Sequence, residues 1–174
     1  MSYCYFHGIV PVSEGRRVQT VRANGTTVWH AIYDSMFVTE SAEADINGVF
    51  RTFAPASESN IPSDKLVLVH GKLAIPSLAN KDSPIEFVIE SINHHVFNTN
   101  PEDEDFDSFL PENTIPVLCM LGNVTGPVVD MGDGSRAVDV RVSSYVQNKV
   151  IESTFRHVFN RVYIIALFTI MMIL

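Results

Sequence analysis

The sequence predicts an all-β fold organised around a small five-stranded barrel, and three observations support this. Residues 65–77 and 84–97 read as two strands joined by a short polar turn. Gly71 stands inside the first of them, where a missing side chain allows the sharp bend that a small barrel needs at a corner. Near Ser91 the apolar positions of the second strand slip by one residue, which indicates a β-bulge.

The faces of these two strands can be assigned from their alternation. On residues 65–77 one face is apolar or small, and it carries Val67, Val69, Gly71, Leu73 and Ile75. The other face is mixed, and it carries Leu66, Leu68, His70, Lys72 and Ala74. Because side chains alternate between the two faces of a strand, the first set predicts the barrel interior.

The chain before this hairpin supplies the other strands of the barrel. Residues 3–12 are aromatic and β-branched, as is typical of a strand. Residues 18–22 and 26–33 flank Asn24-Gly25, a dipeptide that predicts a hairpin with a type I′ turn.

A second turn signal, Asn47-Gly48, precedes a predicted strand at residues 49–53. Residues 41–45 are polar and weakly helical. Residues 55–64 are rich in Ser, Asn and Pro, and they predict a loop.

The formal net charge of the 174-residue chain is -8, and five acids lie in one short acidic run. That run belongs to residues 99–113, which predict a solvated linker. Phe106, Phe109 and Leu110 lie within it, so the stretch from Glu102 to Leu110 has an alternative interpretation as a docking motif for a basic protein partner. The net negative charge argues against strong sequence-independent binding of phosphates, but it does not argue against binding through base stacking.

The second half of the chain predicts further strands. Residues 114–125 form one of them, Asp133-Gly134 marks a turn, and Val138, Val140 and Val142 alternate with polar residues in another. Ile151, Ser153, Phe155, His157 and Phe159 share one parity and predict a third strand. An apolar tail follows, from Val162 to Leu174.

Composition and motifs narrow the function classes. Two cysteines and the lack of a secretory signal at the N-terminus predict an intracellular protein, nuclear or cytoplasmic. No nucleotide-binding glycine fingerprint or nucleophile elbow is present, and Cys4 and His7 have no second pair at zinc-site spacing. We therefore expect no enzyme, no cofactor and no metal. The thirteen-residue tail is short for a membrane span, so membrane association is the lesser alternative.

Several motifs resemble a known family. Val69-His70-Gly71-Lys72, followed by a turn and a second strand, resembles the fourth and fifth strands of an OB-fold, as in replication protein A-like single-strand-binding domains. The pieces 122–125, 133–136 and 143–146 are similar to uncharacterised OB-like proteins of mushroom-forming fungi. The resemblance implies an OB-like five-stranded barrel followed by a partial second OB-like unit and an apolar C-terminal tail.

This resemblance suggests a division of the chain. Residues 1–98 would form the OB-like barrel, 99–113 the acidic linker, 114–160 the partial second unit and 161–174 the tail. The second unit lacks a counterpart of its last two strands. We therefore expect a truncated or mis-spliced product whose tail is non-native, which RNA reads across Asn160 and Arg161 would test.

The resemblance also implies a function and candidate residues. OB-folds bind oligonucleotides on the face of their second and third strands. The candidates for base stacking are Trp29, Tyr33, Phe50 and Phe53, and the candidates for phosphate contact are Arg22, Arg51 and Lys72. Arg51 is expected to face outward if the two phenylalanines do not. The alternatives are that the aromatics are core residues, and that the barrel is a platform for protein interaction.

Overall fold

The computed structural model describes residues 2–22, 24–37, 46–55, 57–76, 86–97, 116–159 and 170–173, and all regular structure within these ranges is β. The strands are β1 Tyr3–Val21, β2 Thr27–Phe37, β3 Ile46–Phe53, β4 Lys65–Ala74, β5 Phe87–Val96, β6 Val117–Leu121, β7 Asn123–Val124, β8 Val129–Asp130, β9 Arg136–Val146, β10 Lys149–Phe159 and β11 Ile170–Ile173.

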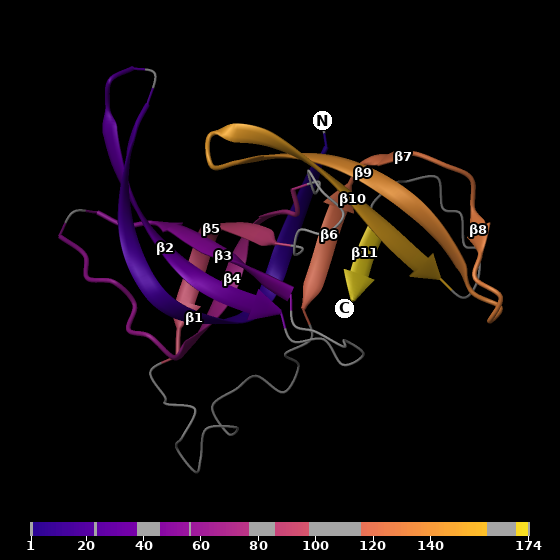
Figure 1. The fold of residues 1–174 in the computed structure, drawn as a ribbon, viewed down its shortest axis with the longest axis horizontal. Coiled ribbons are helices and arrows are strands. Elements are labelled where there is room, and N and C mark those ends of the chain that lie inside the picture. The colour runs from indigo at the N-terminus through magenta and orange to yellow at the C-terminus, as the bar shows by residue number, and fades with distance from the viewer. Residues whose placement is uncertain are drawn as a thin grey trace, which may run out of the picture.

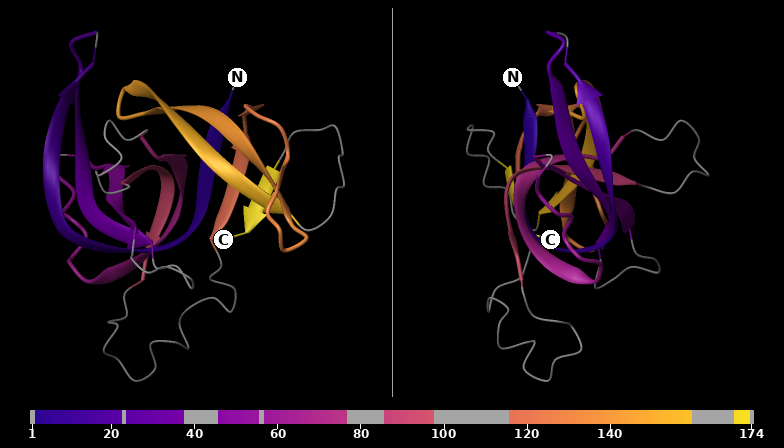
Figure 2. Two further views of the ribbon diagram at one scale, coloured as in Figure 1. Left: turned by 45° about the vertical axis from the view of Figure 1, so that its right-hand side comes forward. Right: turned by 90° about the vertical axis from the view of Figure 1, so that its left-hand side faces the viewer.

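The first five strands close into a barrel (Figures 1 and 2). They follow the order β1-β2-β3-β5-β4, and β4 pairs back onto β1. The β3–β5 pair is parallel, and the other four pairs are antiparallel. This strand order and closure are those of an OB-fold, so the predicted fold class is confirmed.

One long strand, β1, replaces the two separate strands predicted at residues 3–12 and 18–22. It spans 19 residues. Its first half pairs with β4 through Tyr5–Val12, and its second half pairs with β2 after a register shift between Ser13 and Arg16. Gly15 lies in this shift, where an added Cβ would approach Tyr33 Cε1 to 2.5 Å. The chain can therefore bend around the barrel without ending the strand.

The β4–β5 hairpin has the predicted faces and the predicted bulge. Val67, Val69 and Leu73 are buried. The register passes from His70 opposite Asn93 to Gly71 opposite Ser91, so Ile92 is the extra residue. An added Cβ on Gly71 would lie 2.6 Å from the Glu90 carbonyl oxygen. The glycine thus permits the two backbones to approach closely at the bulge.

The prediction of a type I′ turn at Asn24-Gly25 is wrong. The hairpin between β1 and β2 forms, but only Gly25 of this pair has a positive φ, 79°. The Gly25 N–H donates to the Arg22 carbonyl (2.9 Å), and the Arg22 N–H donates to the Thr26 carbonyl (2.9 Å). These bonds describe a three-residue hairpin loop that ends in a left-handed glycine.

The prediction of a turn at Asn47-Gly48 is also wrong, because both residues lie inside β3. Gly48 pairs with Phe87 of β5. An added Cβ would lie 2.4 Å from Phe87 Cγ and 2.5 Å from the Phe87 carbonyl oxygen. The glycine is therefore required by close packing and not by a turn.

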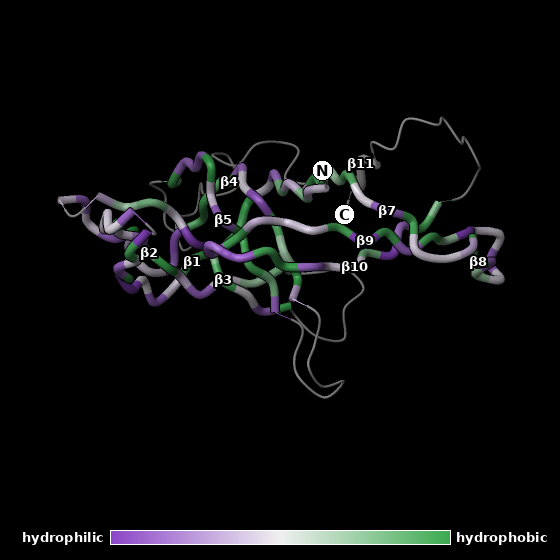
Figure 3. Tube along the Cα trace, turned by 90° about the horizontal axis from the view of Figure 1, so that it is seen from above, coloured by the Kyte–Doolittle hydropathy of each residue, from purple (hydrophilic) through white to green (hydrophobic). Residues whose placement is uncertain are grey.

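The second group of strands extends from the barrel (Figure 3). β6 pairs with the start of β1, and β7 and β8 pair with β9 in a separate sheet. The predicted alternation holds, since Val140, Val142, Ile151 and Phe155 are buried. Val140, Val142 and Phe155 belong to the same apolar cluster as the barrel interior, so the two sheets share a core.

Several predictions fall outside the described residues. These are the weakly helical segment at residues 41–45, the acidic linker from Glu102 to Leu110, and the first part of the apolar tail. The end of the tail supplies β11, which pairs with β6. The division into two units stays a prediction. No helix among the described residues is long and apolar enough to cross a bilayer.

We expect stability to fall as the pH drops below about 6.5, the ordinary pKa of histidine. Burial lowers the pKa of His30, His94 and His157 in the folded chain. A folded state with lowered histidine pKa values binds fewer protons than the unfolded state, so protonation favours unfolding. Denaturant midpoints at about pH 7.5 and 5.5 measure this. Replacing His94, whose ring packs edge-on against Phe50, by Gln should flatten the dependence. Equal midpoints for the unmodified protein would contradict the expectation.

Candidate nucleic-acid interface

The structure separates the seven predicted binding residues into four environments. Tyr33 and Phe50 lie in the barrel core, Trp29 lies beneath an arginine, and Lys72 lies on β4. Phe53 contacts a residue that the sequence did not suggest, His30, on whose pKa the charges of Arg51 and Arg22 act. His30 lies on the outer face of β2, Arg51 and Phe53 lie on the outer face of β3, and Arg22 follows the end of β1.

The expectation that Tyr33 and Phe50 stack bases is corrected by their burial. Tyr33 is 1% exposed and Phe50 is 0% exposed. Their rings lie against each other with centroids 5.8 Å apart, and the Tyr33 hydroxyl accepts a hydrogen bond from the Ile61 N–H (2.8 Å). Both side chains therefore hold the barrel together and present no free ring face.

Phe53 has the opposite orientation and is 57% exposed. It is the last residue of β3 and pairs in register with His30 of β2. The two rings meet edge to face, with centroids 6.4 Å apart and an interplanar angle of 86°. The His30 contact fixes one side of the Phe53 ring, and more than half of the side chain remains open to solvent.

The charges of two arginines act on the histidine of this aromatic pair. The positive charges of Arg51 and Arg22 both act to lower the pKa of His30, after burial as the largest cause. The negative charge of Glu90 acts in the opposite direction and raises the pKa of His30. We call Arg22, His30, Arg51 and Phe53 the Phe53 patch. It combines an exposed aromatic ring with cationic side chains, which is the combination that single-strand binding uses.

Arg51 is expected to face outward if Phe50 and Phe53 do not, and this condition is not met because Phe53 is exposed. The Arg51 position is on the outer face, opposite in parity to Phe50, but the residue is only 4% exposed. Its Nη2 donates to Thr20 Oγ1 at 3.4 Å, and its Nε has no hydrogen-bond partner among the described residues. Glu90, its register partner on β5, accepts a hydrogen bond from the Gln147 N–H (2.7 Å). The Arg51 side chain is therefore too buried to make a surface contact, and its contribution to the patch is its positive charge.

The indole ring of Trp29 packs against another side chain of the protein. The Arg17 guanidinium carbon lies 5.8 Å from the centroid of the Trp29 ring. Arg17 also donates hydrogen bonds to the carbonyls of Ala54, Pro55 and Glu58. This arginine fastens the loop after β3 to the β1–β2 hairpin and covers one face of the indole ring.

Lys72 lies on a strand that does not pair with β2 or β3. Its Nζ is 5.9 Å from the Tyr145 ring centroid and donates to the Tyr145 carbonyl at 3.4 Å. A pocket of about 570 Å³ opens here, and it is lined by Ser2, Tyr3, Tyr5, Lys72, Asn123, Ser143, Ser144, Tyr145 and Val150. Lys72 is therefore separate from the Phe53 patch.

No family model matches the chain, and no curated protein matches it. Solved structures that do match include the wild-type single-stranded DNA-binding protein from Thermus aquaticus and a deletion mutant of it. The identity is 11% in both, and the alignments cover 90% of this chain and 73% and 75% of those chains. The TM-scores are 0.45 and 0.44. The strand order and closure of the barrel, and not these similarities, establish the fold.

Proposed function

We propose that this protein is a non-enzymatic OB-fold module that binds single-stranded nucleic acid through the Phe53 patch. The observation that supports it is the exposed Phe53 ring, which is braced by His30 on the outer face of β2 and β3. The positive charges of Arg51 and Arg22 act on the same histidine. The outer face of these two strands is the face on which OB-folds bind oligonucleotides. Phe53 would stack one base, and Arg22 would neutralise a phosphate.

We expect the Phe53→Ala variant to bind labelled single-stranded DNA or RNA about 5- to 150-fold more weakly, because stacking on one aromatic ring contributes about 1–3 kcal/mol per base. Fluorescence anisotropy at low salt measures the affinity. The Arg22→Ala variant should also reduce the slope of log affinity against log salt by about 0.7, the value for one phosphate of a single strand.

Arg136→Ala is the matched control, because Arg136 is exposed at the start of β9 in the second sheet. Its affinity should equal that of the unmodified protein. Absence of binding at low salt, where electrostatic attraction is strongest, would reject the function. Unchanged affinity in both Phe53→Ala and Arg22→Ala would reject the site.

The alternative function, a protein-interaction or scaffold module, depends on the segment from Glu102 to Leu110. That segment lies outside the described residues. The alternative and the intracellular location stay predictions from the sequence.

A further inference from the structure

β10 is an outer strand, and one of its edges has no partner among the described strands. It has 11 residues and pairs with β9 along its whole length without a register shift. The sheet order β10-β9-β7 places no described strand on its other side. An unpaired edge of this length presents a row of backbone donors and acceptors that another strand can use.

The turn before β10 determines which backbone groups face that edge. Gln147 and Asn148 form a two-residue loop with φ values of 53° and 62°, as a type I′ turn requires. Val146 and Lys149 are therefore a hydrogen-bonded pair, and such pairs alternate along an antiparallel ladder. It follows that the odd-numbered residues of β10 bond to β9, and the even-numbered residues direct their N–H and C=O groups to the free edge.

The side chains of β10 divide in the same way. The odd-numbered residues Ile151, Ser153 and Phe155 are buried against the core. The even-numbered residues face solvent, and they are Val150, Glu152, Thr154, Arg156 and Val158. Val150 is 66% exposed and Val158 is 49% exposed. An added strand would thus leave the core unchanged and cover this outward row.

We propose that β10 pairs antiparallel with β10 of a second copy of this chain, about a two-fold axis at Thr154. In this register Val150 faces Val158 of the partner subunit, and Glu152 faces Arg156 of the partner subunit. The full length of the strand is paired, with about ten backbone hydrogen bonds. The interface is an isologous one, as a closed dimer requires.

The charges select this register over its neighbours. Because the outward row must meet the outward row, the strands can slide only in steps that keep the alternation. A slide of two residues in either direction places Glu152 and Arg156 opposite Thr154 or a valine. A further step sets Glu152 against Glu152, or Arg156 against Arg156, and like charges directly opposite each other are destabilising. Only the register with full overlap pairs opposite charges.

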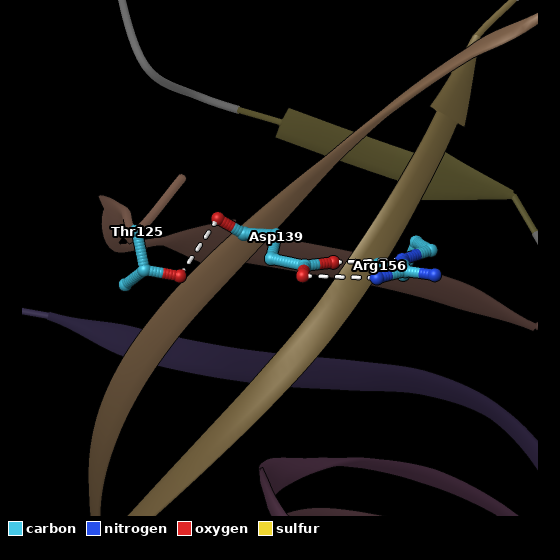
Figure 4. Close-up of polar contacts among 3 residues, drawn as sticks. All are labelled: Thr125, Asp139 and Arg156. Carbon is cyan, nitrogen blue, oxygen red and sulfur yellow. Dashed lines mark hydrogen bonds and ion pairs between the residues drawn. The ribbon is translucent and has the colours of Figure 1, made fainter. Parts of the chain in front are cut away.

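Arg156 is already held in a suitable position (Figure 4). Its Nε donates to Asp139 Oδ1 at 2.8 Å, and its Nη2 donates to Asp139 Oδ2 at 3.0 Å. This fork uses one side of the guanidinium, and Nη1 takes no part in it. Nη1 would donate a hydrogen bond to the carboxylate of Glu152 of the partner subunit. One arginine would then be bonded to carboxylates on both of its neighbouring strands.

The mass of the full chain in solution tests the proposal. Sedimentation equilibrium should show a dimer that dissociates on dilution. Thr154→Pro should give a monomer with an unchanged β-type circular dichroism spectrum, because the lost N–H belongs to the free edge. Thr154→Ala keeps the N–H and should remain dimeric. A monomeric unmodified protein at every concentration, or a dimeric Thr154→Pro variant, would overturn the proposal.

A cysteine cross-link tests the register independently of that proline variant. Thr154 lies on the two-fold axis, where the Cα atoms of a hydrogen-bonded pair are about 5.5 Å apart, within the range for a disulfide. Thr154→Cys should therefore give a covalent dimer on a non-reducing gel. The Val158→Cys variant has the same native cysteines, but its new cysteine faces Val150 of the partner subunit. It should therefore give no covalent dimer. Failure of the first to cross-link, or equal cross-linking by both, would reject this register.

Discussion

Replacement of Gly48 by alanine is expected to destabilise the barrel by at least about 3 kcal/mol, at the upper end of the range for overpacked cores. The new Cβ would lie 2.4 Å from Phe87 Cγ and 2.5 Å from the Phe87 carbonyl oxygen. Phe87 is fully buried and stacks on Phe37 with ring centroids 4.0 Å apart, so its ring has no free space to enter. Relief therefore requires the parallel β3–β5 pair to separate, and that pair is one of the five that form the barrel. Urea denaturation measures the loss.

Gly126→Ala is the matched control, since nothing lies within 4 Å of its added Cβ and its φ is not in the left-handed region. A compatible Gly→Ala change reduces the entropy of the unfolded chain, and we expect no loss and a gain of up to about 1 kcal/mol. Equal stability of the Gly48→Ala and Gly126→Ala variants would mean that β3 and β5 do not approach as described.

Replacement of Tyr33 by alanine is expected to cost about 3–5 kcal/mol, the usual range for truncating a buried aromatic ring. The ring packs against Phe50 in the interior, and its hydroxyl accepts the Ile61 N–H. Tyr33→Phe separates the two contributions. It keeps the ring and leaves the Ile61 N–H without this partner, so we expect a loss of about 1–3 kcal/mol. Thermal and urea unfolding of the three proteins give the comparison.

Phe53→Ala supplies the contrast, because an exposed side chain away from the core usually changes stability by no more than about 0.5 kcal/mol. Tyr33→Ala should therefore weaken folding, and Phe53→Ala should weaken nucleic-acid binding while folding is preserved. A stable Tyr33→Ala variant with impaired binding would place Tyr33, and not Phe53, on the binding surface.

The sequence predicted the parts of the fold that depend on alternation. The β4–β5 hairpin, its bulge near Ser91 and the buried row of β9 all follow from apolar residues at a period of two. Asn47-Gly48 was misread because a glycine that makes room for Phe87, distant in sequence, resembles a glycine that makes a turn. The Gln147-Asn148 turn was missed because it reaches two positive φ values without a glycine.

The candidate site was only partly predictable, for a similar reason. Phe50 and Phe53 are three residues apart on one strand, so they face opposite sides, but local sequence does not state which side is the interior. The contact between His30 and Phe53 arises from the β2–β3 register, which connects residues 23 positions apart. The burial of Arg51 depends on its surroundings on neighbouring strands, among them Thr20 on β1. These relations arise from pairing between strands that are distant in sequence, which local alternation does not determine.

The long β1 strand has a consequence for the order in which the protein can assemble during synthesis. Its Tyr5–His7 segment is translated before both of its partners, β4 on one edge and β6 on the other. Those partners are translated roughly 65 and 110 residues later, so ring closure is a non-local event, and folds dominated by such pairings form in milliseconds to seconds. The Tyr5–His7 segment therefore has neither partner until β4 is made, and it lacks β6 until residues 117–121 are made. A chaperone that protects an apolar β-strand would act on this segment during that interval.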